Sequence, residues 1–351
     1  MKIIRQECWK QDLQLKEPYT IAYETISSCA NVFLRLETDT GIVGWGCAAP
    51  DLAVTGETGD SVLTNYHDTL APVLQGCDPC QYVRINDELM ERITGNPSAL
   101  AMVDMALHDI VAKAAEIPLY KLLGGFRDSI PTSVTIGILS VDQTVEKALD
   151  LTGQGFRILK IKGGAVVTED IEKVSKVREA VGGEIEIRFD ANQGYSVEEA
   201  LRFIRSTETA GIAFLEQPTD KTDDELMKQV CQQAPIPIMA DESLTTLKDM
   251  YRLSAGGYTD LINIKLMKVG GITEALRINS VATTGGIEAM VGCMDESALG
   301  ISAGLHFALS QRNIIYADLD GHLDLVDDPF PGALRLEKGV LYPLDKPGLG
   351  I

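Results

Sequence analysis

Apolar and polar positions follow two different patterns along the chain, and the change falls near residue 125. Within 32–45 they alternate on both sides of a polar turn, which is typical of two paired strands. Within 58–115 apolar residues recur every three or four positions, and Pro97 stands where a helix would begin. We therefore predict an α+β domain over residues 1–125.

After residue 125, short apolar runs alternate with stretches of helical periodicity. Eight such runs start 24 to 28 residues apart, near 132–138, 157–162, 185–190, 212–216, 236–241, 261–265, 287–291 and 314–318. Strand-plus-helix units of this size are those of a closed parallel barrel, whose eight units hold about 250 residues. A doubly wound open sheet is the alternative, but it would more often carry a glycine-rich fingerprint after its first strand, and none stands there. We predict an α/β TIM-like barrel over residues 126–324.

Composition narrows the class of protein. The chain has 351 residues, of which 45% are hydrophobic and 23% charged, as expected for a folded chain of about two domains. Its 51 acidic and 31 basic residues give a net charge of −20, which disfavours nucleic acid and anionic membrane surfaces as partners. We expect no signal peptide and no membrane span, because no apolar run has the required form. Seven scattered cysteines predict reduced thiols and a cytoplasmic location.

Three acidic residues end consecutive predicted strands of the barrel. Asp190, Glu216 and Asp241 close the third, fourth and fifth strands and stand 26 and 25 residues apart. Because active sites of such barrels lie at the carboxyl ends of the strands, the three carboxylates should converge. They would repel one another unless a cation neutralised them, and an all-oxygen set favours Mg²⁺, with Mn²⁺ possible. For any single acid the alternative is a cap on the following helix.

Lysines occupy two other strands. Lys160 and Lys162 share one face of the second strand, and Lys265 ends the sixth. These strands are opposite each other in an eight-stranded ring, so Lys162 and Lys265 should face one another across the mouth. One amine could remove a proton from the carbon beside a carboxylate, and the other could return one from the opposite face, which inverts that carbon through an enediolate. Nearby cations and burial should lower the lysine pKa toward about 7–8. A network of structural ion pairs is the alternative.

Together these segments resemble the enolase superfamily, and within it the muconate-lactonizing-enzyme-like subgroup and its dipeptide epimerases. The motifs that carry the resemblance are Lys160-Ile161-Lys162, Asp190-Ala191-Asn192-Gln193-Gly194-Tyr195, Glu216-Gln217-Pro218, Asp241-Glu242-Ser243 and Ile264-Lys265-Leu266-Met267-Lys268. The resemblance covers nearly the whole chain. It implies a (β/α)₇β barrel with an α+β capping domain, which the C-terminal tail, about residues 325–351, completes.

The resemblance also implies roles for these residues. It makes the three strand-end acids the ligands of one Mg²⁺ ion per subunit, and Lys162 and Lys265 the acid/base pair. Lys160 would hold the reacting carboxylate, and Thr135, at the end of the first strand, would lie near the substrate.

Asp318 and Asp320, after the last predicted strand, point to the substrate class. In dipeptide epimerases a DxD pair at this place holds the α-ammonium of the first amino acid. The chemistry agrees, because two acids two residues apart share a face and an ammonium offers three donors. Two solvated surface acids are the alternative. An o-succinylbenzoate synthase or other cycloisomerase would use the same lysines but binds no ammonium, and a non-catalytic binding barrel would need neither lysine.

Three further acids suggest which side chain the substrate carries. Family members that act on Ala-Glu carry an arginine in place of Glu24, and Asp51 and Asp295 stand where those enzymes tend to be neutral. An acidic pocket repels a Glu side chain and attracts Lys or Arg. We therefore expect an isomerase, a Mg²⁺-dependent dipeptide epimerase that prefers a basic residue at the epimerised second position. Ala-Glu specificity with a merely solvated Glu24 is the alternative, and a homo-oligomer stays open.

Overall fold

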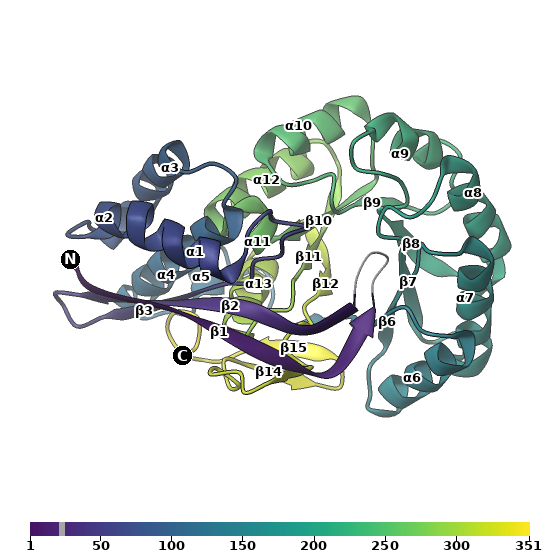
Figure 1. Cartoon of the computed structure of the whole chain (residues 1–351), viewed down its shortest axis with the longest axis horizontal. Helices are drawn as coiled ribbons and strands as arrows, with labels where there is room; N and C mark the ends of the chain where they lie inside the picture. Colours follow the sequence, from purple (N-terminus) through teal and green to yellow (C-terminus); the bar gives the residue numbers. More distant parts are fainter. Residues whose placement is uncertain (21–24) are drawn as a thin grey trace.

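The protein is described here from a computed structural model, which defines residues 1–20 and 25–351 (Figure 1). An N-terminal part, built on an antiparallel sheet, lies beside a larger ring of strands and helices. The ribbon formed by β1 (Ile3–Thr20) and β2 (Thr25–Thr38) reaches from the first part toward β6 (Ile158–Lys162) of the ring. The predicted combination of an α+β domain and a TIM-like barrel is confirmed.

The N-terminal sheet has the order β13-β1-β2-β3, with β3 at Val43–Ala48 and β13 at Leu325–Val326. Its strands pair antiparallel, and the apolar side chains of β2, such as Leu34, are buried against helices. The helices of this part are α1 (Gly59–Asn65), α2 (Ala71–Leu74), α3 (Tyr82–Arg92), α4 (Pro97–Ala114) and α5 (Leu119–Leu122), with a π-helical turn at Tyr66–Leu70 and a 3₁₀ turn at Pro79–Gln81.

Helix α4 joins the two parts of the molecule. It begins at Pro97, as predicted, and the carboxylate of Glu57 accepts hydrogen bonds from the backbone N–H groups of Ser98 (2.8 Å) and Ala99 (3.1 Å) at its start. It is buried on almost every side rather than along one stripe, because it lies between the N-terminal sheet and the barrel. Its Asp104 accepts a hydrogen bond from the backbone N–H of Thr273 (3.0 Å), which ties the helix to the barrel.

The barrel consists, within the described residues, of eight parallel strands in sequential order. They are β5 (Val134–Ile136), β6, β7 (Glu186–Asp190), β8 (Ile212–Glu216), β9 (Ile238–Ala240), β10 (Leu261–Lys265), β11 (Glu288–Gly292) and β12 (Ile314–Asp318). The connecting helices are α6 (Val141–Gly153), α7 (Val167–Val181), α8 (Val197–Ser206), α9 (Asp224–Cys231), α10 (Leu247–Gly256), α11 (Leu266–Val269), α12 (Ile272–Thr284) and α13 (Ala298–Ser310), with a 3₁₀ turn at Glu208–Ala210. Each connection between neighbouring strands contains a helix, which is the predicted (β/α)₇β arrangement.

A backbone hydrogen bond closes the ring of strands, and buried side chains fill its interior. The backbone N–H of Ser133 donates to the carbonyl of Ala317 (3.1 Å), which joins the first strand to the last. Inside the barrel, the buried guanidinium of Arg188 donates to the same carbonyl (2.8 Å) and lies over the rings of Phe214 and Tyr316. An ion pair with Glu186 (2.8 Å), the cation–π contacts and this hydrogen bond satisfy a charge that would otherwise be costly to bury.

The C-terminal residues contact both parts. Strand β13 pairs with β1 in the N-terminal sheet, whereas β14 (Leu334–Glu337) and β15 (Val340–Pro343) form a small sheet with β4 (Ile130–Pro131). The domain boundaries at residues 125 and 324 stay a prediction. Among the described residues, none of the helices has the length and apolar character that a membrane crossing requires.

The predicted strands match the observed ones to within a few residues. The largest differences are at β5 and β9, which are shorter at both ends than expected. Strand β9 ends at Ala240, so Asp241 follows the strand instead of closing it. The carboxyl ends of the barrel strands nevertheless form one edge, because neighbouring strands are parallel and in register.

Candidate active site

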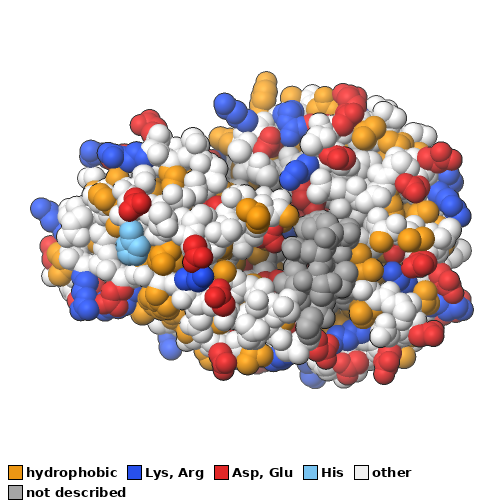
Figure 2. All heavy atoms as spheres, viewed as in Figure 1, with side chains coloured by type: hydrophobic (Ala, Val, Ile, Leu, Met, Phe, Trp, Pro, Cys, Tyr) orange, Lys and Arg blue, Asp and Glu red, His pale blue; other side chains and the backbone are white. Residues whose placement is uncertain are grey.

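A cavity of about 530 Å³ lies at that edge, and both parts of the molecule line it. The barrel contributes Thr135, Lys160, Lys162, Lys265, Asp318 and Asp320, and the N-terminal part contributes Glu17, residues 27–30 and residues 49–52. Acidic side chains are spread over both parts on the face shown in Figure 2. Glu24, the first of the three predicted specificity residues, lies outside the described residues.

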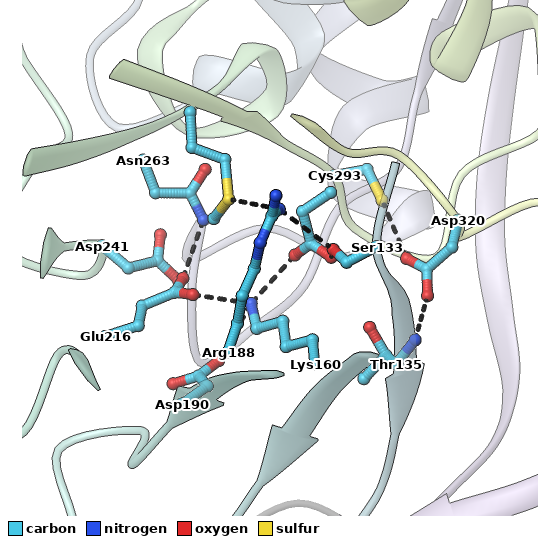
Figure 3. A network of polar contacts seen from close by, with 12 residues as sticks. Ser133, Thr135, Lys160, Arg188, Asp190, Glu216, Asp241, Asn263, Cys293 and Asp320 are labelled. Carbon is cyan, nitrogen blue, oxygen red and sulfur yellow. Dashed lines mark hydrogen bonds and ion pairs between the residues drawn. The ribbon is translucent and has the colours of Figure 1, made fainter. Parts of the chain in front are cut away.

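Six buried charged side chains form what we call the charged floor, namely Lys160, Asp190, Glu216, Asp241, Lys265 and Lys268. In the sheet register, Lys162 is paired with Asp190 and Asp190 with Glu216, so these strand ends share one row. The Nζ atom of Lys160 lies 3.1 Å from Oδ2 of Asp190 and 2.9 Å from Oε2 of Glu216 (Figure 3). Burial opposes the charge of Lys160, but attraction by Asp318, Glu216 and Asp190 outweighs it and holds its pKa well above the ordinary value.

Asp241 is held by two lysines. Its Oδ2 accepts a hydrogen bond from Nζ of Lys265 (2.8 Å), and Nζ of Lys268 contacts both its Oδ1 and its backbone carbonyl. Burial works against the carboxylate, but the two ammonium groups keep the pKa of Asp241 below its usual range. For Lys265, burial is the largest single influence and lowers the pKa, but the surrounding acids, Asp241 followed by Glu216 and Glu242, together raise it by more, so the net shift is upward. The expected lowering toward about 7–8 is therefore wrong for Lys265 while it contacts Asp241.

The loops behind these acids are held in strained conformations. Asn192, Gln193 and Gln217 are non-glycine residues with φ of 42°, 68° and 32°. The side chain of Gln217 accepts from the backbone N–H of Asp241 (2.9 Å) and donates to the hydroxyl of Ser243 (2.9 Å), so it ties the end of β8 to the end of β9. Strain of this kind persists only where surrounding bonds enforce it, and it clusters at functional sites.

The carboxylate oxygens of the charged floor are suitable ligands for a hard divalent cation. Oδ1 of Asp190 accepts from the backbone N–H of Asn192 (2.9 Å), and Oε1 of Glu216 accepts from Nδ2 of Asn263 (2.8 Å). In the part of the chain that the structure describes, the second oxygen of each carboxylate is buried and meets only the Lys160 ammonium, without hydrogen-bond geometry. Burial outweighs the attraction of Lys160 and raises the pKa of Glu216 to about 8. An added cation would relieve this excess of buried acid.

The three predicted metal ligands do not, however, stand ready as a set. Within residues 1–20 and 25–351, no three acidic, histidine or cysteine side chains are arranged to hold a metal ion. The physical reason is Asp241, because both of its carboxylate oxygens are turned toward lysines. Ligation of Mg²⁺ by Asp190, Glu216 and Asp241 stays a prediction. It requires the Asp241 carboxylate to leave one of its lysine partners and to bind the ion instead.

Lys162 and Lys265 come from opposite sides of the ring. Lys162 ends β6 and Lys265 ends β10, and three strands separate β6 from β10 in either direction around the barrel. Both side chains line the cavity, Lys265 nearly buried and Lys162 partly exposed. The topology thus provides one amine on each side, although their contact with a common substrate atom stays a prediction.

The two acids of the DxD pair have different partners. Asp318 ends β12, and its carboxylate accepts from Nζ of Lys160 (2.9 Å) and from the hydroxyl of Ser133 (2.6 Å). Asp320 follows in the next loop, and its Oδ2 accepts from the backbone N–H of Thr135 (2.6 Å; Figure 3). Both acids and Thr135 line the cavity, as predicted for a site that binds substrate there.

These partners give the two acids opposite pKa shifts. Burial is the largest influence and opposes the charge of Asp318, but Lys160 and the hydroxyl of Ser133 together outweigh it and lower the pKa to about 2. Burial and the charge of Asp318 raise the pKa of Asp320 to about 7. The thiol of Cys293 is 3.9 Å from Oδ1 of Asp320, a long contact that leaves this oxygen suited to a stronger donor. Asp320 is therefore the member of the pair that a ligand ammonium would stabilise more.

Acidic side chains also surround the entrance to the cavity. We call Glu17, Asp51, Asp295 and Asp324, together with Lys147, the acidic mouth. Oδ1 of Asp51 accepts from the backbone N–H groups of Ala53 and Val54 (2.8 Å each), so this carboxylate also holds its own loop. Nζ of Lys147 forms an ion pair with Oε2 of Glu17 (2.7 Å). The sequence did not single out Glu17, Lys147 or Asp324, because scattered surface charges carry no pattern.

Two family models match the chain in sequence order. Residues 4–124 match the mandelate racemase / muconate lactonizing enzyme N-terminal domain, and residues 143–351 match the enolase C-terminal domain-like family. The chain belongs to the mandelate racemase and muconate lactonizing enzyme family. The resemblance to the enolase superfamily is thereby confirmed.

Curated and solved members of this family are similar over the full length. The chain is 45% identical to the L-Lys-D/L-Arg epimerase of Desulforapulum autotrophicum, over 100% of its own length and 99% of the relative's. The substrate-liganded structure of the L-Ala-D/L-Glu epimerase of Bacillus subtilis is 41% identical, with a TM-score of 0.98 and coverage of 100% and 99%. The dipeptide epimerase of Methylococcus capsulatus, complexed with Mg and L-Arg-D-Lys, is 39% identical, with a TM-score of 0.94 and coverage of 100% and 99%. The predicted isomerase class is confirmed, and Mg in the relative's complex agrees with the predicted cofactor.

Proposed function

We propose that this family member is a Mg²⁺-dependent dipeptide epimerase, which inverts the Cα of the second residue of a dipeptide by a two-base 1,1-proton transfer. The observation that supports this best is the placement of Lys162 and Lys265, which line one cavity from opposite sides of the ring. A single base can exchange the proton on one face of a carbon, whereas inversion requires a second group on the other face.

The residues of the floor have distinct tasks in this scheme. When bound, Mg²⁺ would supply positive charge next to the substrate carboxylate, with Asp190, Glu216 and Asp241 as its protein ligands. Lys160 keeps its charge among these acids and would add a second positive group where the enediolate develops negative charge. One of Lys162 and Lys265 removes the Cα proton as a neutral amine, and the other donates a proton as an ammonium.

The DxD pair favours a dipeptide over a substrate without an amine. Asp320 is a half-buried acid whose pKa of about 7 reflects burial and the neighbouring Asp318. A substrate α-ammonium would neutralise it and would occupy its Oδ1, which among the described residues has only the long contact to a thiol. A cycloisomerase substrate carries no such group and would not offset the repulsion of Asp320 by Asp318.

We also propose that the second residue of the substrate is basic. The acidic mouth holds four acids and one lysine, so a cationic side chain entering the cavity would be attracted and a glutamate repelled. Two similar proteins support this choice: one is named L-Lys-D/L-Arg epimerase, and another was solved with L-Arg-D-Lys. The similarity to an L-Ala-D/L-Glu epimerase is nearly as high, so the side-chain preference rests on the acids of this chain.

The test is a comparison of four dipeptides in D₂O with Mg²⁺. Deuterium uptake at Cα, read by mass, and the change of configuration together report proton transfer and inversion. We expect kcat/KM to be higher for Ala-Lys and Lys-Lys than for Ala-Met, which has a similar length without charge, and lowest for Ala-Glu. Faster turnover of Ala-Glu than of Ala-Lys would contradict the basic preference, and no deuterium uptake with any dipeptide would contradict the epimerase itself.

A further inference from the structure

A single side chain of the N-terminal sheet holds the barrel loop that carries Asp295. Asn31 lies on β2, is 0% exposed, and stands 264 and 266 residues before the two positions it contacts. Its Nδ2 donates to the backbone carbonyl of Asp295 (3.0 Å), and its Oδ1 accepts from the backbone N–H of Ser297 (2.8 Å). One carboxamide therefore bridges both sides of Glu296.

The orientation of this carboxamide is fixed by its partners. The Asp295 carbonyl can only accept and the Ser297 N–H can only donate, so the amide nitrogen and oxygen have one arrangement that satisfies both. The thiol of Cys47 also donates to Oδ1 of Asn31 (3.3 Å), which agrees with this arrangement. An aliphatic residue could make neither bond, and an aspartate could make only the one from Ser297.

The conformation of the loop places one of two adjacent acids at the cavity and the other in the interior. Asp295 lines the cavity, whereas Glu296 is buried behind it and accepts from the backbone N–H of Met294 (3.0 Å). The start of the following helix has a second anchor, since Asp328 accepts from the hydroxyl of Ser297 and from the N–H of Ala298 (2.6 Å each). The helix side is thus anchored by both Asp328 and Asn31, and Asn31 also holds the backbone carbonyl of Asp295.

We propose that Asn31 is a specificity-positioning residue: by bridging Asp295 and Ser297 it keeps the Asp295 carboxylate at the cavity, and selection of a basic side chain depends on this bond. The inference rests on the proposed epimerase function with its basic preference and adds to it the residue that holds the selecting acid. Asn31 itself does not line the cavity, so its effect must pass through the loop.

The test is a double-mutant cycle of Asn31→Ala and Asp295→Asn. The measured quantity is the selectivity ratio, kcat/KM for Ala-Lys divided by kcat/KM for Ala-Met. We expect each single variant to lower this ratio by about 5- to 10-fold, mainly through KM for Ala-Lys, as the loss of one charged contact would do. In the Asp295→Asn background, Asn31→Ala should change the ratio no further, because the two act through one group.

Controls separate selectivity from general damage to the fold. Asp328→Asn weakens the anchored helix start without touching the Asp295 bond, so it should lower the melting temperature and leave the ratio unchanged. If Asn31→Ala does not fold, Asn31→Asp retains the Ser297 bond and loses the one to Asp295, and it should also lower the ratio. An unchanged ratio in the folded Asn31 variant, while Asp295→Asn lowers it, would overturn the inference.

The same measurements distinguish a failure of the proposed function. A wild-type ratio near one would overturn the basic preference, together with the role assigned to Asn31. A high wild-type ratio that Asp295→Asn lowers and Asn31→Ala does not would overturn the Asn31 inference alone.

Discussion

The charged floor and the acidic mouth hold their charges in different ways. In the floor, Lys160 is 2% exposed and Glu216 is 0% exposed, and each has a partner within 3 Å. In the mouth, the ion-paired side chains of Glu17 and Lys147 are 72% and 33% exposed. Buried charges require fixed partners, whereas exposed charges are screened and cost little to change. We infer that the floor fixes the reaction and that the mouth sets the choice of substrate.

The two regions also differ in origin. Every member of the floor belongs to the barrel, on a strand or within a few residues after one, where backbone hydrogen bonds fix its position. The mouth combines loops and helix α6 of the barrel with β1 and the loop after β3. Its geometry therefore depends on how the N-terminal part packs against the barrel. The buried side-chain amide of Asn31 makes two of the hydrogen bonds between these parts. Changes in the floor should abolish activity, while changes in the mouth should redirect it.

The largest expected effect is that of Glu216→Gln in the floor. The change removes one buried negative charge but retains the volume and the contact with Asn263. Because several kcal/mol of transition-state stabilisation is at stake, we expect kcat/KM to fall about 10³-fold or more. Calorimetric titration with Mg²⁺ should show weaker binding, and EDTA should inactivate the wild type reversibly. Glu208→Gln, an exposed acid on the outside of the barrel, is the matched control; retention of Mg²⁺ affinity by Glu216→Gln would refute the metal assignment.

A smaller effect is expected at Asp320, between the two regions. Asp320→Asn removes the charge that would pair with the substrate α-ammonium, so KM for dipeptides should rise about 10- to 100-fold, the cost of a charged hydrogen bond. Kinetics with a dipeptide and its N-acetyl derivative check this, because the derivative has no ammonium and should not distinguish the variant from the wild type. Equal losses with both compounds would exclude the assigned role. Asp318→Asn should lower kcat as well, because Asp318 contacts Lys160.

A pH-dependent effect on stability is expected from Glu296, the buried neighbour of Asp295. Burial raises its pKa from 4.5 to about 8, although the Met294 N–H and Lys265 favour the charged form. Between these two values the folded state keeps a proton that the unfolded state releases, so stability falls as the pH rises. Glu296→Gln has no such proton to release. The slope of the free energy of unfolding against pH should therefore differ between this variant and the wild type by about 1 kcal/mol per pH unit. Urea unfolding at pH 5, 6.5 and 8 measures both slopes; parallel curves would show that Glu296 is ionised in the folded protein.

The smallest effect is expected at Asp51. One of its carboxylate oxygens already accepts two backbone N–H groups of its own loop. Asp51→Asn retains that acceptor and removes only a partly exposed charge. The ratio of kcat/KM for Ala-Lys to kcat/KM for Ala-Met should therefore change less than about threefold. A change at Asp51 as large as that at Asp295 would show that the two acids of the mouth contribute equally, contrary to the geometry.

The sequence predicted much of the charged floor because the ends of parallel strands have a regular arrangement in a barrel. Parallel strands place their carboxyl ends at one edge, so regular spacing predicted that Asp190, Glu216, Lys162 and Lys265 would surround one site. It did not reveal that Asp241 would be held by both Lys265 and Lys268, because those contacts depend on how a loop turns after its strand. Asn263, two residues before Lys265, was a missed signal, since strand alternation places it on the same face.

The mouth was far less predictable. Asp51 and Asp295 were identified through the family resemblance, and both line the cavity. Glu17 and Lys147 meet across 130 residues, and Asn31 reaches Asp295 across 264. Contacts between loops at such separations depend on the packing of whole domains, which residue types and spacing do not encode.

Deuterium exchange by single-lysine variants tests the two-base arrangement. Lys162→Ala and Lys265→Ala are each incubated in D₂O and Mg²⁺ with both epimers of Ala-Lys, and mass and configuration at Cα are recorded, with the exposed Lys176→Ala as control. Neither Lys162→Ala nor Lys265→Ala should interconvert the epimers; each should exchange the Cα proton of only one epimer, and that epimer should differ between the variants. Interconversion by either variant, or exchange of the same epimer by both, would show that the two lysines do not act from opposite faces.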